Sequence, residues 1–128
     1  EFSAVMIYEP GKDNERIRGL KIEVIEEGRY ERSNISFLDL EEIESLSRAI
    51  EYMTILSIKW QDIKKEYTEV VFSTKDDFKI GFYQKGTEQK SFSSSGYARE
   101  LICFFSSMQD LISVKTIVDK GLKLLSEI

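Results

Sequence analysis

Two clusters of acidic residues in this sequence could bind a metal ion or act in acid–base catalysis. The first is the cluster Asp39, Glu41, Glu42 and Glu44, whose carboxylates could bind a divalent cation. Asp39 is also placed to cap a helix, with Glu42 at the capping-box position, and acids at a helix start interact favourably with the helix dipole. Because the segment lacks the glycine and the alternating acids of a calcium loop, we predict a capped helix and no metal.

The second acidic group is the pair Asp76 and Asp77, which could provide two carboxylates for acid–base chemistry. Adjacent residues of a turn usually point apart, and Asp is a common turn former. We therefore predict a turn here. The serine-rich run at 91–97 could form a flexible binding loop or a plain hairpin connection, and we expect 94–96 to be a loop.

Bases alternate with aromatic residues in the second half of the chain. On a sheet, such a pattern could follow a single nucleic-acid strand and stack its bases. The plainer interpretation is solvated lysines on a sheet with an aromatic core. From this group we predict the partner-binding residues Lys79, Tyr83, Lys85, Lys90, Phe92 and Tyr97.

The composition excludes several kinds of active site. The 128 residues contain no histidine and one cysteine, so a Ser-His-Asp triad, a Cys-His pair, a His-ligated zinc and an intramolecular disulfide are all excluded. Cys103 lies between Ile102 and Phe104, which favours a buried, inert thiol. No glycine-rich phosphate loop occurs. We predict no enzyme, no catalytic residue and no cofactor, and keep a hydrolase that relies on carboxylates alone as a third hypothesis.

Charge is spread unevenly along the chain, whose net charge is −5. Residues 1–58 carry 13 acids and 7 bases, and residues 59–128 carry 10 acids and 11 bases. An acidic domain repels phosphate backbones at long range. Nucleic acid is therefore less expected as a partner than a protein or a small polar ligand, although the second half could still present a basic face.

Hydrophobic periodicity predicts the elements that must position these residues. Alternation and turn signals predict strands at 2–8, 20–27, 32–38, 67–74, 78–83, 89–93 and 99–105, and apolar stripes predict helices at 39–58 and 107–125. In the third strand we expect Ile35 and Phe37 to point inward. The prediction is a single α+β domain over 1–128, with antiparallel sheets packed on two helices and no membrane span.

The elements follow the same order twice, which suggests pseudo-repeats at about 1–60 and 66–128. Residues 20–28 match 78–86 at a shift of 58, and 39–43 match 107–111 at a shift of 68. Two strand–hairpin–strand–helix units related by a pseudo-two-fold axis would cover each other's apolar faces. In element order alone, this arrangement resembles the single-stranded-DNA-binding transcriptional coactivator fold.

The segment from Glu66 to Tyr83, EYTEVVFSTKDDFKIGFY, resembles small exported proteins of unknown function from Bacteroidetes-type bacteria. It departs from them at Asp77, where they commonly have Gly. The resemblance implies export through a cleaved leader, in agreement with a sequence that begins at Glu1 without Met, and it supplies no catalytic residue. We expect a periplasmic or secreted protein, with a cytoplasmic one as the alternative.

These observations favour a non-catalytic binding or protein-interaction module whose partner is unknown, and they leave a homodimer open. The alternative is a single-stranded nucleic-acid-binding protein that uses the basic and aromatic second half.

Overall fold

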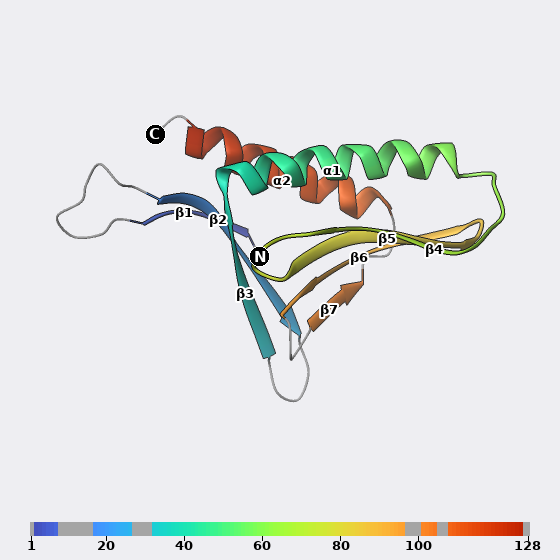
Figure 1. Ribbon diagram of the computed structural model, residues 1–128, viewed down its shortest axis with the longest axis horizontal. Coiled ribbons are helices and arrows are strands. Elements are labelled where there is room, and N and C mark those ends of the chain that lie inside the picture. Colours follow the sequence, from blue (N-terminus) through green and yellow to red (C-terminus); the bar gives the residue numbers. More distant parts are fainter. Residues whose placement is uncertain (1, 8–16, 27–31, 97–100, 105–107, 127–128) are drawn as a thin grey trace.

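The structure is a computed structural model that describes residues 2–7, 17–26, 32–96, 101–104 and 108–126 (Figure 1). Its elements follow the predicted order and confirm the α+β class. They are β1 (Phe2–Ile7), β2 (Ile17–Glu26), β3 (Arg32–Asp39), α1 (Leu40–Lys59), β4 (Lys65–Ser73), β5 (Phe78–Gly86), β6 (Glu88–Ser95), β7 (Leu101–Phe104) and α2 (Met108–Ser126).

The strands form two antiparallel sheets with the simplest connectivity. Sequence neighbours pair in the orders β1-β2-β3 and β4-β5-β6-β7. The β5–β6 hairpin is tight because Lys85 pairs with Glu88, and Gly86 adopts the positive φ of +62° that such a turn demands. Whether the two strand-and-helix units descend from one duplicated unit stays a prediction.

Helix α1 begins where the capping signal predicts. The Asp39 side chain accepts a hydrogen bond from the Glu42 backbone N–H at 2.8 Å. This bond is the main cause of the lowered pKa of Asp39, and Lys75 at 3.4 Å lowers it further. The Glu42 carboxylate accepts a bond from the Lys75 backbone N–H instead of closing a capping box. The acidic cluster therefore caps the helix and attaches it to the β4–β5 turn.

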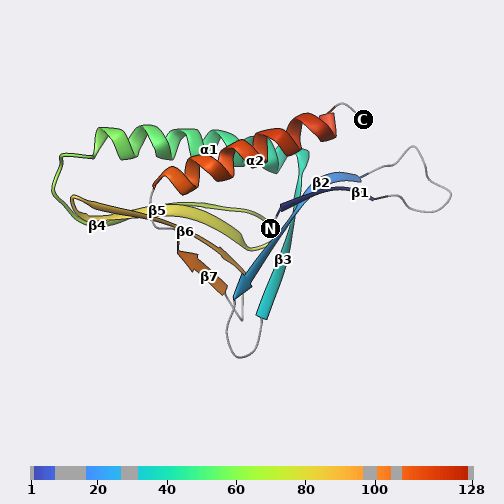
Figure 2. The ribbon, with the colours of Figure 1, turned by 180° about the vertical axis from the view of Figure 1, so that it is seen from behind.

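The two helices run antiparallel on the same side of the strands (Figures 1 and 2). Both contribute a buried stripe, Ile43, Leu46, Ile50 and Met53 from α1 and Leu111, Val114, Val118 and Leu125 from α2. Gly121 is also buried, and a Cβ there would lie 3.3 Å from Leu20 Cδ1. The absent side chain lets α2 approach β2 closely.

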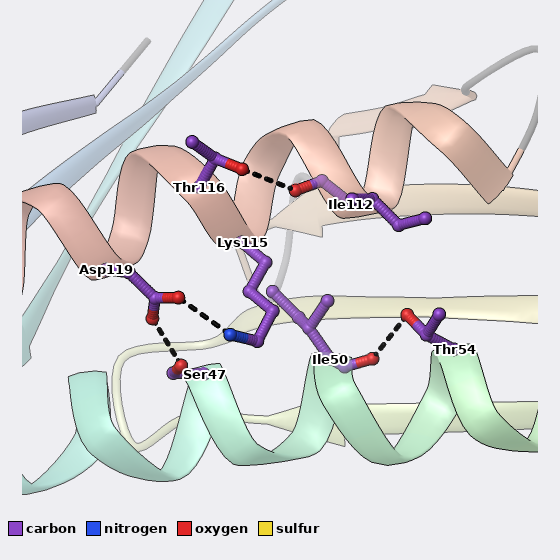
Figure 3. A network of polar contacts seen from close by, with 7 residues as sticks. All are labelled: Ser47, Ile50, Thr54, Ile112, Lys115, Thr116 and Asp119. Carbon is purple, nitrogen blue, oxygen red and sulfur yellow. Dashed lines mark hydrogen bonds and ion pairs between the residues drawn. The ribbon is translucent and has the colours of Figure 1, made fainter.

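A polar contact joins the helices in the middle of their length (Figure 3). Ser47 of α1 donates a hydrogen bond to the Asp119 carboxylate of α2, and Lys115 Nζ lies 2.7 Å from the same carboxylate. Burial alone would raise the pKa of Asp119, but the bonds from Lys115 and Ser47 outweigh it, so the pKa is lowered. The carboxylate is ionised at neutral pH and pairs the helices.

The two sheets meet along a polar seam, and here the prediction for the third strand was wrong. Ile35 is 55% exposed, whereas Ser36 is 1% exposed and buried. The Ser36 hydroxyl lies 2.8 Å from the Ser95 hydroxyl and donates to the Asp76 carbonyl at 2.9 Å. Because these bonds satisfy the buried hydroxyl, the strand turns its serine inward and its isoleucine outward; Phe37, also expected inward, is only half-buried.

The serine-rich run is a strand over its described part. Residues 91–95 belong to β6, and Ser91, Ser93, Ser94 and Ser95 are all buried. A loop was therefore wrong for Ser94 and Ser95. Of these serines, Ser95 contacts the other sheet, since its hydroxyl lies 2.8 Å from that of Ser36.

A buried amide fixes the connection between α1 and β4. The Gln84 side chain of β5 is 0% exposed, and its Nε2 donates to the carbonyls of Trp60, Ile63 and Gly86 at 3.0, 2.7 and 3.0 Å. Its Oε1 accepts from Gln89 Nε2 at 2.9 Å. A single side chain thus satisfies the polar backbone of the connection.

Some predicted features lie outside what the structure describes, among them the placement of Tyr97, the predicted helix start at 107 and the side chain of Cys103. Neither helix in the described residues is long and apolar enough to cross a membrane.

Candidate functional site

The four-stranded sheet has one face packed on the helices and one face turned away from them (Figure 1). Phe78, Ile80, Phe82 and Gln84 of β5 point inward and are at most 1% exposed. Since side chains alternate along a strand, the residues between them form the opposite face. We call this the outer face and define it by Tyr67, Glu69, Val71, Ser73, Lys79, Gly81, Tyr83, Lys85, Glu88, Lys90, Phe92, Ser94, Ile102 and Phe104.

Pairing registers arrange the outer face in rows across the strands. The central row is Val71, Gly81, Phe92 and Phe104, one residue from each strand. The row on one side of it is Glu69, Tyr83 and Lys90, and the row on the other side is Ser73, Lys79, Ser94 and Ile102. Five of the six predicted binding residues therefore lie together on this face, and Tyr97 lies outside the described residues.

Apolar side chains are exposed at both edges of the outer face, on β4 and β7. Phe104 is 66% exposed, Tyr67 58%, Ile102 47% and Val71 42%. Phe92 and Tyr83 are half-buried between them. Single exposed apolar residues are ordinary, but a contiguous group is typical of an interaction site. Sequence analysis did not select Tyr67, Val71, Ile102 or Phe104, because only the strand pairing shows that they adjoin the predicted residues.

Rings and charged groups on the outer face contact one another in pairs. The rings of Tyr67 and Tyr83 lie 5.5 Å apart, and the Tyr67 hydroxyl donates to Glu69 at 3.0 Å. Partial loss of hydration raises the pKa of Tyr67, and the bond to Glu69 raises it further. The hydroxyl is therefore a neutral donor at pH 7. Lys90 Nζ lies 3.3 Å from Glu88. Lysines and glutamates are thus mixed around the apolar centre.

Gly81 has a structural role at the centre of this face. A Cβ built there would lie 2.2 Å from the Val70 carbonyl oxygen, so any side chain would collide with β4. The glycine therefore permits the close approach of the two strands.

The acidic pair is in a turn, as predicted. Asp76 accepts a hydrogen bond from the Phe37 backbone N–H at 2.7 Å, which ties the turn to β3. Asp77 has a left-handed φ of 58°, a conformation that Gly adopts most readily and Asp tolerates. Among the described residues, no three His, Cys, Asp or Glu side chains gather as a metal site would require.

A second candidate is an open hollow of about 240 Å³ at the seam between the sheets, lined by Arg32, Ser33, Asn34 and Leu101. The Asn34 amide donates to the Ser95 carbonyl at 2.9 Å. Part of the polar lining is therefore engaged by the fold itself, which makes the hollow a weaker candidate for a ligand than the outer face.

Scans against family models and searches of curated proteins and of solved structures gave no significant match to this chain.

Proposed function

We propose that this protein is a non-catalytic protein-interaction module that binds its partner with the outer face of the four-stranded sheet. The observation that carries the proposal is the group of apolar side chains on this face. They are exposed on the edge strands β4 and β7, with Phe104 at 66% and Tyr67 at 58% exposure, and half-buried between them at Tyr83 and Phe92. Aromatic residues at the centre and a charged rim are typical of protein interfaces. The two helices lie on the opposite face of this sheet (Figure 1).

Several carboxylates are held by partners within the fold, which supports a non-catalytic role. Asp39 caps α1, Asp76 accepts from β3, and Asp119 of α2 accepts from Ser47 of α1. Each of these groups is held by a partner within the fold, so its geometry is explained without a substrate.

Photo-crosslinking tests the proposal. A benzophenone amino acid replaces Phe104 on the outer face or, as the matched control, the exposed Glu44 on α1, in cells of the organism that encodes the chain. We expect nuclease-resistant protein adducts from position 104 and none from position 44. No adduct at position 104, or the same adducts from both positions, would overturn the proposal.

A second candidate function is single-stranded nucleic-acid binding, which one observation favours. Lys79, Lys85 and Lys90 share the outer face with Tyr83 and Phe92, as a base-stacking surface requires. Glu69 and Glu88 on the same face oppose phosphate binding, which ranks this candidate second. Fluorescence anisotropy of a labelled oligonucleotide tests it: an affinity no better than millimolar at about 50 mM salt would rule it out.

A further inference from the structure

Strand β4 is at an edge of the four-stranded sheet, where its backbone pairs with β5 alone. In an antiparallel pair, the N–H and C=O groups of successive residues point alternately to the partner strand and away from it. Thr74 donates to the Phe78 carbonyl at 2.9 Å, and the Val70 carbonyl oxygen lies against Gly81 of β5. Even-numbered residues of β4 therefore bond to β5. The backbone groups that point away from β5 are those of Glu69, Val71 and Ser73.

The outward backbone groups of β4 are open to a further strand. None of the residues that the structure describes donates to them or accepts from them, and the side chains of the same residues are exposed. Natural edge strands are commonly protected from further pairing by a lysine, a proline or a bulge. Residues 68–73 contain neither lysine nor proline, and the irregularity of β4 lies before them, between Lys65 and Thr68.

An edge of the other sheet is protected within the fold. The Phe37 N–H of β3 points away from β2, and the Asp76 carboxylate of the β4–β5 turn accepts its bond at 2.7 Å. Beside it, the Asp76 carbonyl accepts from the Ser36 hydroxyl at 2.9 Å. The turn therefore occupies part of the edge of β3, whereas the edge of β4 has no such cover among the described residues.

The flank of α1 on the side of the β4 edge is apolar. Over the four-stranded sheet, α1 contacts β4 and β5 whereas α2 contacts β6, so the flank of α1 away from α2 lies toward the free edge. Ser47 marks the flank that contacts α2. Leu56 follows about two and a half turns later, on the opposite flank, with Ala49 and Trp60. These three residues pack against the core and are only half-buried. A strand added to β4 would place alternate side chains against them.

We propose that the edge of β4 binds an extended segment of another protein, which joins the sheet as a fifth strand next to β4. This inference goes beyond the proposed function, because the site is the edge of the sheet and not its outer face. An open row of backbone donors and acceptors is matched by another extended backbone, which fixes the conformation of the ligand. The apolar flank of α1 favours apolar residues at every second position of that ligand.

The charges of β4 indicate the residues at the other positions of the ligand. The strand exposes Glu66 and Glu69, whereas Lys65 is half-buried with its Nζ 4.1 Å from the centre of the Trp60 ring. Opposite charges on neighbouring strands stabilise a sheet. The expected ligand is therefore a strand in which apolar residues alternate with basic ones. A paired segment of about 20 Å makes a small contact, and we expect a dissociation constant on the order of 100 μM.

NMR titration of the full chain with an eight-residue peptide of alternating valine and lysine, blocked at both ends, tests the proposal. We expect saturable binding, and binding at least tenfold weaker for the matched peptide of alternating valine and glutamate. In the free chain, amide hydrogen exchange should be fast at Val71 and Ser73 and slow at Val70 and Phe72. The bound lysine peptide should slow exchange at Val71 and Ser73.

Proline variants test the role of the backbone. Val71→Pro removes one outward N–H and keeps the bonds to β5, so the fold should persist while the affinity for the lysine peptide falls at least tenfold. Ser73→Pro removes the next outward N–H and serves as the second variant if Val71→Pro does not fold. The matched control Val71→Thr keeps the N–H and should bind like the original chain. Equal binding by the original chain and a folded proline variant would overturn the inference.

The remaining outcomes separate this inference from the proposed function. Equal affinity for the two peptides, or no binding at about 1 mM, tenfold above the expected dissociation constant, would overturn the inference. Adducts from position 104 would in that case leave the proposed function standing. Peptide binding without adducts from position 104 would overturn the proposed function alone. A dimer in sedimentation velocity that Val71→Pro dissociates would place a second copy at the edge and overturn the proposed ligand.

Discussion

Replacement of Gln84 by methionine removes the amide that holds the α1–β4 connection while nearly keeping its volume. The carbonyls of Ile63 and Gly86 lose their donor, whereas the Trp60 carbonyl keeps the Ile63 backbone N–H at 3.0 Å. A buried polar group left without a partner costs about 1–3 kcal/mol. For two carbonyls at the edge of the core, we expect the free energy of unfolding to fall by about 2–4 kcal/mol.

Urea denaturation measures this loss, with the fluorescence of Trp60, the chain's one tryptophan, as the signal. Trp60 is a suitable probe because its ring lies 6.0 Å from Phe82 and its carbonyl accepts from Gln84. The matched control is Gln109→Met at an exposed position of α2, which should change stability by less than about 0.5 kcal/mol. A loss below about 1 kcal/mol in Gln84→Met would refute the reasoning.

Gln84→Glu adds a pH dependence whose sign follows from the same geometry. A carboxylate there would be buried among three carbonyl oxygens, so its folded pKa would rise above the unfolded value of about 4.3. Folding then takes up a proton. The loss in free energy of unfolding, relative to the original chain, should therefore shrink for this variant as pH falls from about 8 to about 5. The same loss for Gln84→Met should stay constant over that range. Equal pH profiles for the two variants would contradict the placement of the side chain.

Three further outcomes follow from particular contacts. Gly81→Ala should destabilise the fold by about 2–4 kcal/mol in urea titrations, because its Cβ would lie 2.2 Å from the Val70 carbonyl oxygen; a neutral effect would contradict the close approach of β4. Asp77→Gly should raise the melting temperature and Asp77→Val should lower it, because φ is 58°; the reverse order in calorimetry would contradict this backbone. The lowered pKa values of Asp39 and Asp119 give stability that is present above the unfolded pKa of about 3.9 and lost as pH falls below it. In an acid titration, Asp39→Asn and Asp119→Asn should therefore lose stability less steeply with falling pH than the original chain. Slopes equal to that of the original chain would contradict these contacts.

Alternation and stripes were sufficient to predict the order of the elements, because burial of one face dominates both helices and strands such as β2 and β5. Leu20, Ile22 and Val24 are buried as their spacing predicts. The third strand was predicted in the wrong register, because hydrophobicity favoured Ile35 over Ser36. The partners of Ser36, namely Ser95 and the Asp76 carbonyl, lie 59 and 40 residues away, and no local pattern contains them.

Only part of the candidate site was predicted, because the rest depends on strand pairing between segments that are distant in the sequence. Lys79, Tyr83 and Lys85 share a face because they alternate along one strand, which the sequence displays. Val71 and Phe104 join them only through the registers of β4 with β5 and of β6 with β7. The register of β5 with β6 also depends on a turn in which Gly86 has a positive φ.

Hydroxyl-radical footprinting with and without the partner that crosslinks to position 104 tests most directly whether the outer face is the binding surface. When the partner is bound, oxidation of Phe104 and Ile102 should slow, whereas oxidation of Tyr52 and Ile55, similarly exposed on α1, should not change. Protection of the α1 residues alone, or of neither group while the partner is bound, would contradict the account.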